Sequence, residues 1–79
     1  MSKNIQTIDR IQRIETIKDA LKSAKKQGKK IDFTQFFAIL SLNLGVTTPK
    51  IEEYCEKLRD SGQILYKKRE KLIEWRGNL

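Results

Sequence analysis

The sequence contains no histidine, one cysteine, one proline and four glycines among its 79 residues. Without histidine, and with one thiol, the chain lacks the common general base, the common metal-ligand sets and any intrachain disulfide. No glycine-rich phosphate loop appears, no apolar run approaches the ~18 to 20 residues that span a bilayer, and no secretory segment is visible. We therefore expect a cytoplasmic protein that is not an enzyme, holds no metal or cofactor, binds no small molecule and does not enter a membrane.

Positive charge is what the sequence has in excess. Its 17 Lys and Arg residues against 10 Asp and Glu residues give a net charge of +7, and residues 1–30 supply +6 of it. Such a charge favours an anionic partner such as nucleic acid, although a lysine-rich surface can also serve solubility alone. The length suits one domain, covering residues 1–79, with a small core.

Residues 4–27 lack proline and glycine and carry isoleucine at every third position up to Ile17, which predicts a long first helix. With a spacing of three residues, each isoleucine side chain lies about 60° behind the previous one around the helix axis. The later isoleucines therefore face the core, and the earlier ones point away from it. Two interpretations stay open: either the first turns fray, or residues 1–13 form a dimerisation extension. The cost of exposing three large apolar side chains favours the dimer. Its predicted interface consists of Ile5, Ile8 and Ile11.

A second helix is expected after a short break. Gly28 suits the end of the first helix, and Ile31 is expected to form a short strand. Asp32 is a natural N-cap, with Gln35 three residues later as in a capping box. The helix that follows carries the broad apolar face expected at the centre of the core: Phe33, Phe36, Phe37, Ile39, Leu40, Leu42 and Leu44.

The segment 40–51 has the residue order of two helices joined by a tight glycine turn. Gly45 can adopt the positive φ of a helix C-terminus, and Pro49 suits the first turn of the next helix because that turn needs no N–H there. Ser41 is small where the helices must approach, and Val46 can fill the space beneath the turn. Either of the two threonines before Pro49 can cap the second of these helices.

A third helix is expected from Thr48 to Asp60, with Ile51, Cys55 and Leu58 at the spacing of an inward face. Two apolar runs, 63–67 and 72–75, flank four residues rich in charge and predict a β-hairpin. The expected fold is therefore mainly α with a small β-hairpin and a long N-terminal helix.

This order of elements, over about residues 14–75, resembles the winged helix-turn-helix family. The residues that carry the resemblance are Ser41, Leu44, Gly45, Val46, Thr47, Ile51, Leu58, Gly62 and Ile64. In that family the third helix enters the major groove of double-stranded DNA, and the hairpin touches the neighbouring backbone as a wing. In size and composition the chain is similar to small transcription regulators of archaea and of their viruses or plasmids.

The resemblance also implies which residues meet DNA. Those of the recognition helix are Thr47, Thr48, Pro49, Lys50, Glu53, Tyr54 and Lys57. Those of the wing are Lys67, Lys68, Arg69 and Lys71. Lys29 and Lys30, in the loop after the first helix, would meet the DNA backbone. Lys50 would donate to guanine, and the Tyr54 hydroxyl would reach a phosphate.

The acidity of the third helix departs from strong DNA readers. Glu52, Glu53, Glu56 and Asp60 outnumber its cations, and we expect Glu52, Glu56 and Arg59 to pair along one flank. Two hypotheses follow. The chain is a sequence-specific, homodimeric DNA-binding transcription regulator, or it is a protein-interaction winged-helix module of a replication, transcription or segregation assembly. The acidic helix and the leftover apolar face at Ile5 and Ile8 motivate the second.

Overall fold

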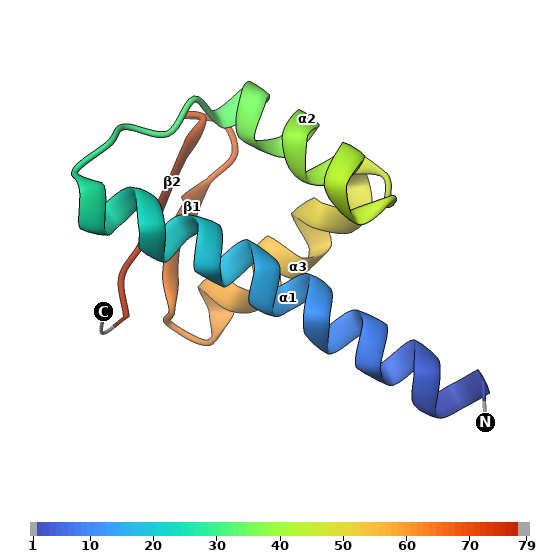
Figure 1. The fold of residues 1–79 in the computed structure, drawn as a ribbon. Coiled ribbons are helices and arrows are strands. Elements are labelled where there is room, and N and C mark those ends of the chain that lie inside the picture. The colour runs from blue at the N-terminus through green and yellow to red at the C-terminus, as the bar shows by residue number, and fades with distance from the viewer. Residues whose placement is uncertain (1, 78–79) are drawn as a thin grey trace.

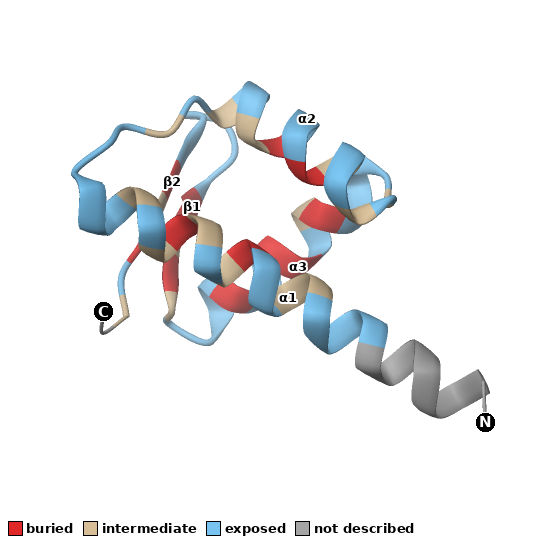
Figure 2. Ribbon diagram, viewed as in Figure 1, coloured by how far each residue is buried: buried red, intermediate tan, exposed pale blue. Residues whose placement is uncertain are grey.

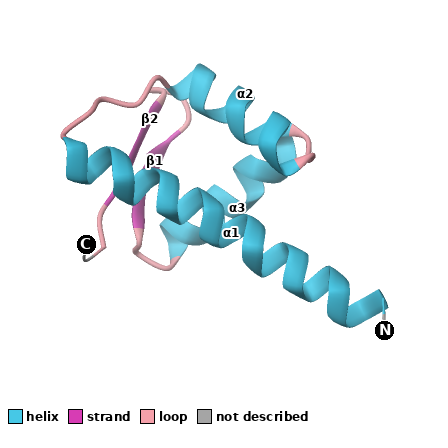
Figure 3. Cartoon of the chain, viewed as in Figure 1, coloured by secondary structure: helices cyan, strands magenta, loops and turns pink. Residues whose placement is uncertain are grey.

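The computed structural model describes the backbone of residues 2–77 and the side chains of residues 9–77. Along the chain come α1 (Ser2–Gln27), α2 (Phe33–Leu44), α3 (Thr48–Asp60), β1 (Ile64–Lys67) and β2 (Leu72–Trp75) (Figure 1). The strands pair antiparallel, with Ile64 opposite Trp75 and Lys67 opposite Leu72. The fold is thus mainly helical with a small hairpin, as expected, and is compatible with a winged helix (Figure 3).

The expected strand at Ile31 is absent. Residues 29–32 have no regular structure, and within the described chain no backbone hydrogen bond joins them to either strand. Gly28, at a φ of 66°, ends α1, and the Asp32 carboxylate caps α2 by accepting from the Gln35 N–H over 3.1 Å. These two fixed ends leave three residues between them. That is too short a segment for a strand, so Ile31 simply packs against the core.

The core lies between α1, α3 and the hairpin, and α2 closes one side of it (Figure 2). Ile17 and Leu21 of α1 are fully buried, as are Ile51 and Cys55 of α3. An aromatic group extends the core under α2, where the ring centroid of Phe37 lies 4.6 Å from Phe33 and 6.2 Å from Tyr66. The other buried apolar side chains are Phe37, Leu40, Tyr54, Leu58, Ile64, Tyr66, Ile73 and Trp75.

Two polar contacts tie α1 to β2. The Lys25 ammonium lies 2.6 Å from the Glu74 carboxylate, which lowers the pKa of that carboxyl group by hydrogen bonding and by charge attraction. The Lys22 ammonium sits 5.0 Å from the ring centroid of Trp75. Both contacts lie in the last three turns of the helix, so this half of α1 is held to the hairpin.

The expectation that Ile39 and Leu42 join the core is wrong. Ile39 is 48% exposed and Leu42 is 83% exposed. Phe37 and Leu40 face the core, and at 100° per residue positions 39 and 42 turn to the opposite side of the helix. A 12-residue helix in so small a domain has a covering layer on one side only, so its second apolar stripe stays in solvent.

The N-terminal part of α1 projects beyond the other elements (Figure 1). Residues 9–12 are all exposed, and the Ile11 side chain is 54% exposed. The side chains of Ile5 and Ile8 lie outside the described residues. Pairing through these three isoleucines therefore stays a prediction.

Burial raises the pKa of the Cys55 thiol from 9.0, and that of the Tyr66 phenol from 10.0, in both cases to about 12. Because the unfolded chain releases these protons first, the free energy of unfolding should be fully retained below about pH 9 and should fall between there and about pH 12. Urea denaturation across this range measures the effect. A Cys55→Ala variant should lose part of the slope, and a stability that stays level to about pH 11 would contradict the buried, neutral state of both groups.

Candidate nucleic-acid interface

The turn between α2 and α3 sets the direction of α3. Gly45 has φ and ψ of 66° and 30°, and its N–H donates to the Ser41 carbonyl oxygen over 3.0 Å. The Ser41 hydroxyl in turn donates to the Val46 carbonyl oxygen over 2.6 Å, so this serine closes the turn from its other side. The left-handed backbone conformation at position 45 favours glycine, because the Cβ of any other residue would strain the backbone there. The angle between α2 and α3 thus depends on Ser41 and Gly45, the two residues that the sequence pattern assigned to this turn.

The start of α3 presents a polar, exposed surface. Thr47 occupies the N-cap position with extended φ and ψ, although its side chain makes no capping hydrogen bond, and Pro49 lies in the first turn. Most of the residues predicted for the recognition helix are exposed, as the helical period required: Thr47, Thr48, Pro49, Lys50, Glu53 and Lys57.

Tyr54 is the exception, and its predicted contact with a phosphate is wrong. The side chain is 2% exposed, because its position three residues after Ile51 and four before Leu58 places it on the inward stripe of α3. Its ring instead supports Lys50, whose ammonium lies 5.5 Å from the ring centroid. The same ammonium is 3.7 Å from a carboxylate oxygen of Glu53. Tyr54 therefore contributes to positioning Lys50 and does not itself face outward.

The wing is attached to α3 by an ion pair that the sequence did not predict. The Lys68 ammonium lies 2.9 Å from the Glu52 carboxylate. The hydrogen bond to this carboxylate and, to a smaller extent, the charge attraction between the two groups raise the pKa of Lys68. Lys67 pairs with Glu70 at 3.6 Å within the wing turn. The residues named for the wing are all exposed: Lys67, Lys68, Arg69 and Lys71.

The expected ladder of Glu52, Glu56 and Arg59 along α3 does not form. Glu52 turns to Lys68 of the wing, and Arg59 pairs with its neighbour Asp60 at 3.1 Å. No sequence signal short of the full hairpin register could have identified this partner, since 16 positions separate Glu52 and Lys68.

Folding gathers three of the predicted contact residues around one shallow hollow of about 340 Å³. Thr48 comes from the first turn of α3, and Lys68 and Lys71 come from the wing. The hollow lies where α2, α3 and the hairpin turn meet, and Phe33 and Phe37 contribute apolar surface to it. The sequence pattern predicted only a core-packing role for these two phenylalanines.

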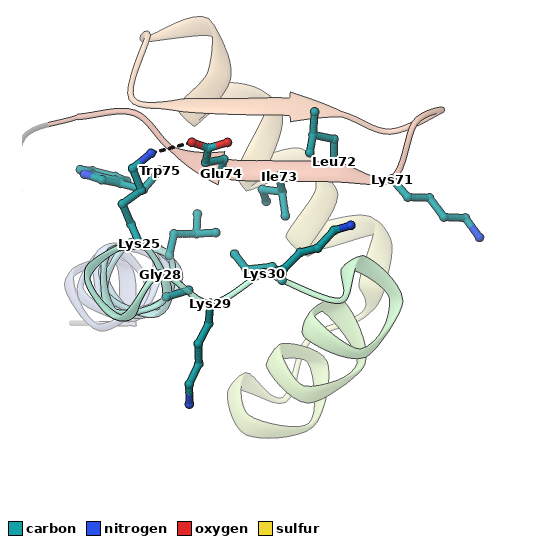
Figure 4. A pocket seen from close by; sticks show the side chains of 12 residues that line it. Lys25, Gly28, Lys29, Lys30, Lys71, Leu72, Ile73, Glu74 and Trp75 are labelled. Carbon is teal, nitrogen blue, oxygen red and sulfur yellow. Dashed lines mark hydrogen bonds and ion pairs between the residues drawn. The ribbon is translucent and has the colours of Figure 1, made fainter.

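Lys29 and Lys30 border a second hollow, of about 240 Å³, between the end of α1 and β2 (Figure 4). Lys25 reaches across to Glu74, whereas Lys29 and Lys71 extend away from the hollow. The cations thus do not converge on a ligand-sized site. Lys71 of the wing borders both hollows.

Within the described part of the chain, no group of three or more His, Cys, Asp or Glu side chains could hold a metal ion. In the same residues, no helix is both long and apolar enough to cross a membrane. Helix α3, the wing and the loop all carry exposed cations.

The burial of Tyr54 leads to a direct test. Tyr54→Ala should lower the free energy of unfolding by about 3 to 5 kcal/mol, as truncation of a buried aromatic ring does, whereas Tyr54→Phe should cost much less. Urea denaturation of both variants measures this. Lys57→Ala, an exposed position on the same helix, serves as the control and should change stability by less than about 0.5 kcal/mol. A Tyr54→Ala variant as stable as that control would contradict the burial of Tyr54.

Comparison with protein-family models, with curated proteins and with solved structures gives no match to this chain. The architecture therefore stands as a three-helix domain with a small antiparallel hairpin, compatible with a winged helix. What it does has to be argued from its surface.

Proposed function

We propose that the chain binds double-stranded DNA as a sequence-specific, homodimeric transcription regulator in the cytoplasm, with α3 in the major groove and the hairpin as the wing. The observation that carries the proposal is the contact between Lys68 and Glu52, 2.9 Å long. It orients the wing beside the first turns of α3. Thr48, in the first turn of the helix, therefore borders the same hollow as the wing cations Lys68 and Lys71.

The acidity of α3 is compatible with this role because its carboxylates are partly neutralised. Glu52 lies against Lys68, and Glu53 lies against Lys50. Exposed ion pairs of this kind are weak, so either lysine can exchange its carboxylate for a phosphate at little cost. Among the described residues, Lys57, Arg69 and Lys71 make no ion pair within 4.0 Å and need no exchange.

A dimer through α1 would complete the binding unit. Two domains related by a two-fold axis would present their α3 helices to successive major grooves, roughly 34 Å apart along the duplex. The exposed Ile11 supports pairing at the projecting part of α1. A pseudo-palindromic target is the geometric consequence.

The proposal predicts different losses for the helix and for the wing. Duplexes selected from a random pool supply the specific site, and binding is then measured by titration against salt. Arg69→Ala with Lys71→Ala should weaken specific and random duplexes alike and reduce the salt slope by about 2, one for each lost phosphate contact. Lys50→Ala should weaken the selected site more than random DNA, because a base contact carries discrimination.

Lys26→Ala is the control, since it removes an exposed cation from the last turn of α1 that is not among the predicted DNA contacts. It should change the affinity less than the wing variant. Absence of duplex binding at tens of micromolar protein in low salt would reject the proposal and favour the protein-interaction module, because non-specific binding alone should be visible there.

A further inference from the structure

The outer edge of β2 runs along the hollow that Lys29 and Lys30 border (Figure 4). All four residues of β2 line this hollow, although successive side chains of a strand point to opposite faces of the sheet. A hollow that touches residues of both faces lies along the edge of the strand. The backbone of β2 therefore faces the hollow over its whole length.

The hydrogen bonds of the hairpin show which backbone groups point outward from β2. The Arg76 N–H donates to the Gln63 carbonyl oxygen over 2.9 Å, so positions 63 and 76 form a hydrogen-bonded pair. Such pairs alternate along an antiparallel ladder with pairs that share no hydrogen bond, and Tyr66 opposite Ile73 is of the second kind. The N–H and the carbonyl oxygen of Ile73 therefore point away from β1, toward the hollow.

Ile73 is left without a partner on this side. Over the backbone that the structure describes, residues 2–77, no hydrogen bond from outside the hairpin reaches it. The residue is only 5% exposed, so water has little access, and buried backbone groups without a partner are rare. The loop 29–31 lies beside the hollow but does not pair, because its two ends are fixed by Gly28 and Asp32. The edge of β2 thus resembles a strand that lacks its neighbour.

We propose that an extended, acidic segment of a partner protein adds to β2 as a third strand and pairs with the N–H and carbonyl oxygen of Ile73. Main-chain hydrogen bonds give such strand addition its affinity, and pockets for alternate side chains give it specificity. The hollow, about 240 Å³, is smaller than the about 300 to 1,000 Å³ of small-molecule pockets. It suits one apolar side chain of the added strand, resting on Leu21, Ala24 and Ile31.

The charge around the hollow selects an acidic segment. Lys29, Lys30 and Lys71 line the hollow, and none of them makes an ion pair within 4.0 Å among the residues whose side chains are described. Lys29 and Lys71 extend outward, where they would meet carboxylates on either side of the apolar residue (Figure 4). Glu74 also lines the hollow, but Lys25 already balances its charge.

Other occupants fit this edge less well. A second copy carries the same charge of +7 and would bring lysines to lysines. A DNA duplex would meet the edge with phosphates, which accept hydrogen bonds but donate none, so the Ile73 carbonyl oxygen would stay unpaired. An extended peptide offers a donor and an acceptor at the spacing of a strand.

Amide chemical shifts of the isotope-labelled full chain, measured without DNA, test the proposal. The probe is the peptide acetyl-Glu-Asp-Val-Ile-Val-Asp-Glu-amide, and one sequence suffices because main-chain pairing tolerates many side chains. The Ile73 amide and its neighbours in residues 71–75 should shift and saturate at millimolar peptide or below. A peptide with lysine at its four acidic positions should bind at least about tenfold more weakly, since it meets the lysines with like charge.

Backbone methylation of the probe tests strand pairing itself. One variant is N-methylated at the second, fourth and sixth residues, and the other at the third and fifth. Alternate residues of a strand direct their N–H groups to opposite sides, so one set faces β2 and the other faces solvent. One variant should therefore lose at least about tenfold in affinity, because Ile73 is left unpaired, and the other should retain most of it.

Filling the hollow tests where the apolar side chain rests. Ala24→Leu should weaken peptide binding by at least about tenfold, because the added side chain occupies the space that the anchor needs. Ser23→Leu is the matched control, since Ser23 is the exposed neighbour on α1 and does not line the hollow. Neither position is among the predicted DNA contacts.

Three results would overturn the proposal: no shift of Ile73 at millimolar peptide, equal affinities for the two methylated peptides, or shifts confined to the lysines of α3. A DNA duplex that saturates the Ile73 shift where the peptide leaves it unchanged would assign the edge to nucleic acid instead. None of these results depends on whether α3 and the wing bind DNA. The failure of this inference and the failure of the proposed function are therefore distinguishable.

Discussion

The inward stripe of α3, formed by Ile51, Tyr54, Cys55 and Leu58, is the surface on which the other elements assemble. α1 brings Ile17 and Leu21 to the same core, and both strands turn alternate side chains toward it. Burying such side chains stabilises by about 1.5 to 3 kcal/mol each, which matters in a domain this small. Because the inner face of α3 is packed so fully, its outer face is held in one direction.

Exposed ion pairs then orient the helices and the hairpin that apolar burial has packed together. The exposed ion pairs Lys68–Glu52 and Lys25–Glu74 connect the hairpin to α3 and to α1. Exposed pairs of this kind contribute less to stability than one buried side chain does, so these pairs orient the hairpin more than they hold it. The pairing also changes how an acidic helix on a basic protein is interpreted. Part of the negative charge of α3 is already balanced by the wing, because Lys68 pairs with Glu52.

Local chemistry made most of the elements predictable. α3 begins at Thr48 and ends at Asp60, as expected, because a proline and a glycine mark its two ends. Gly45 and Asp32 also take the expected roles, since a left-handed turn and an N-cap are properties of a few neighbouring residues. The exposed residues of the candidate site follow from the helical period in the same way. Tyr54 was predicted to face outward, although its spacing from Ile51 and Leu58 is that of the inward stripe.

By itself, the sequence determined the helices, the glycine turn, the hairpin and the concentration of positive charge, because each depends on residues within a few positions of one another. Only the tertiary structure decided the environment of particular side chains: that Leu42 lies outside, and that Glu52 meets Lys68. Those outcomes depend on which elements cover which faces. Which face is covered is a property of the whole fold, because a helix with two apolar stripes buries only the stripe that packs against another element.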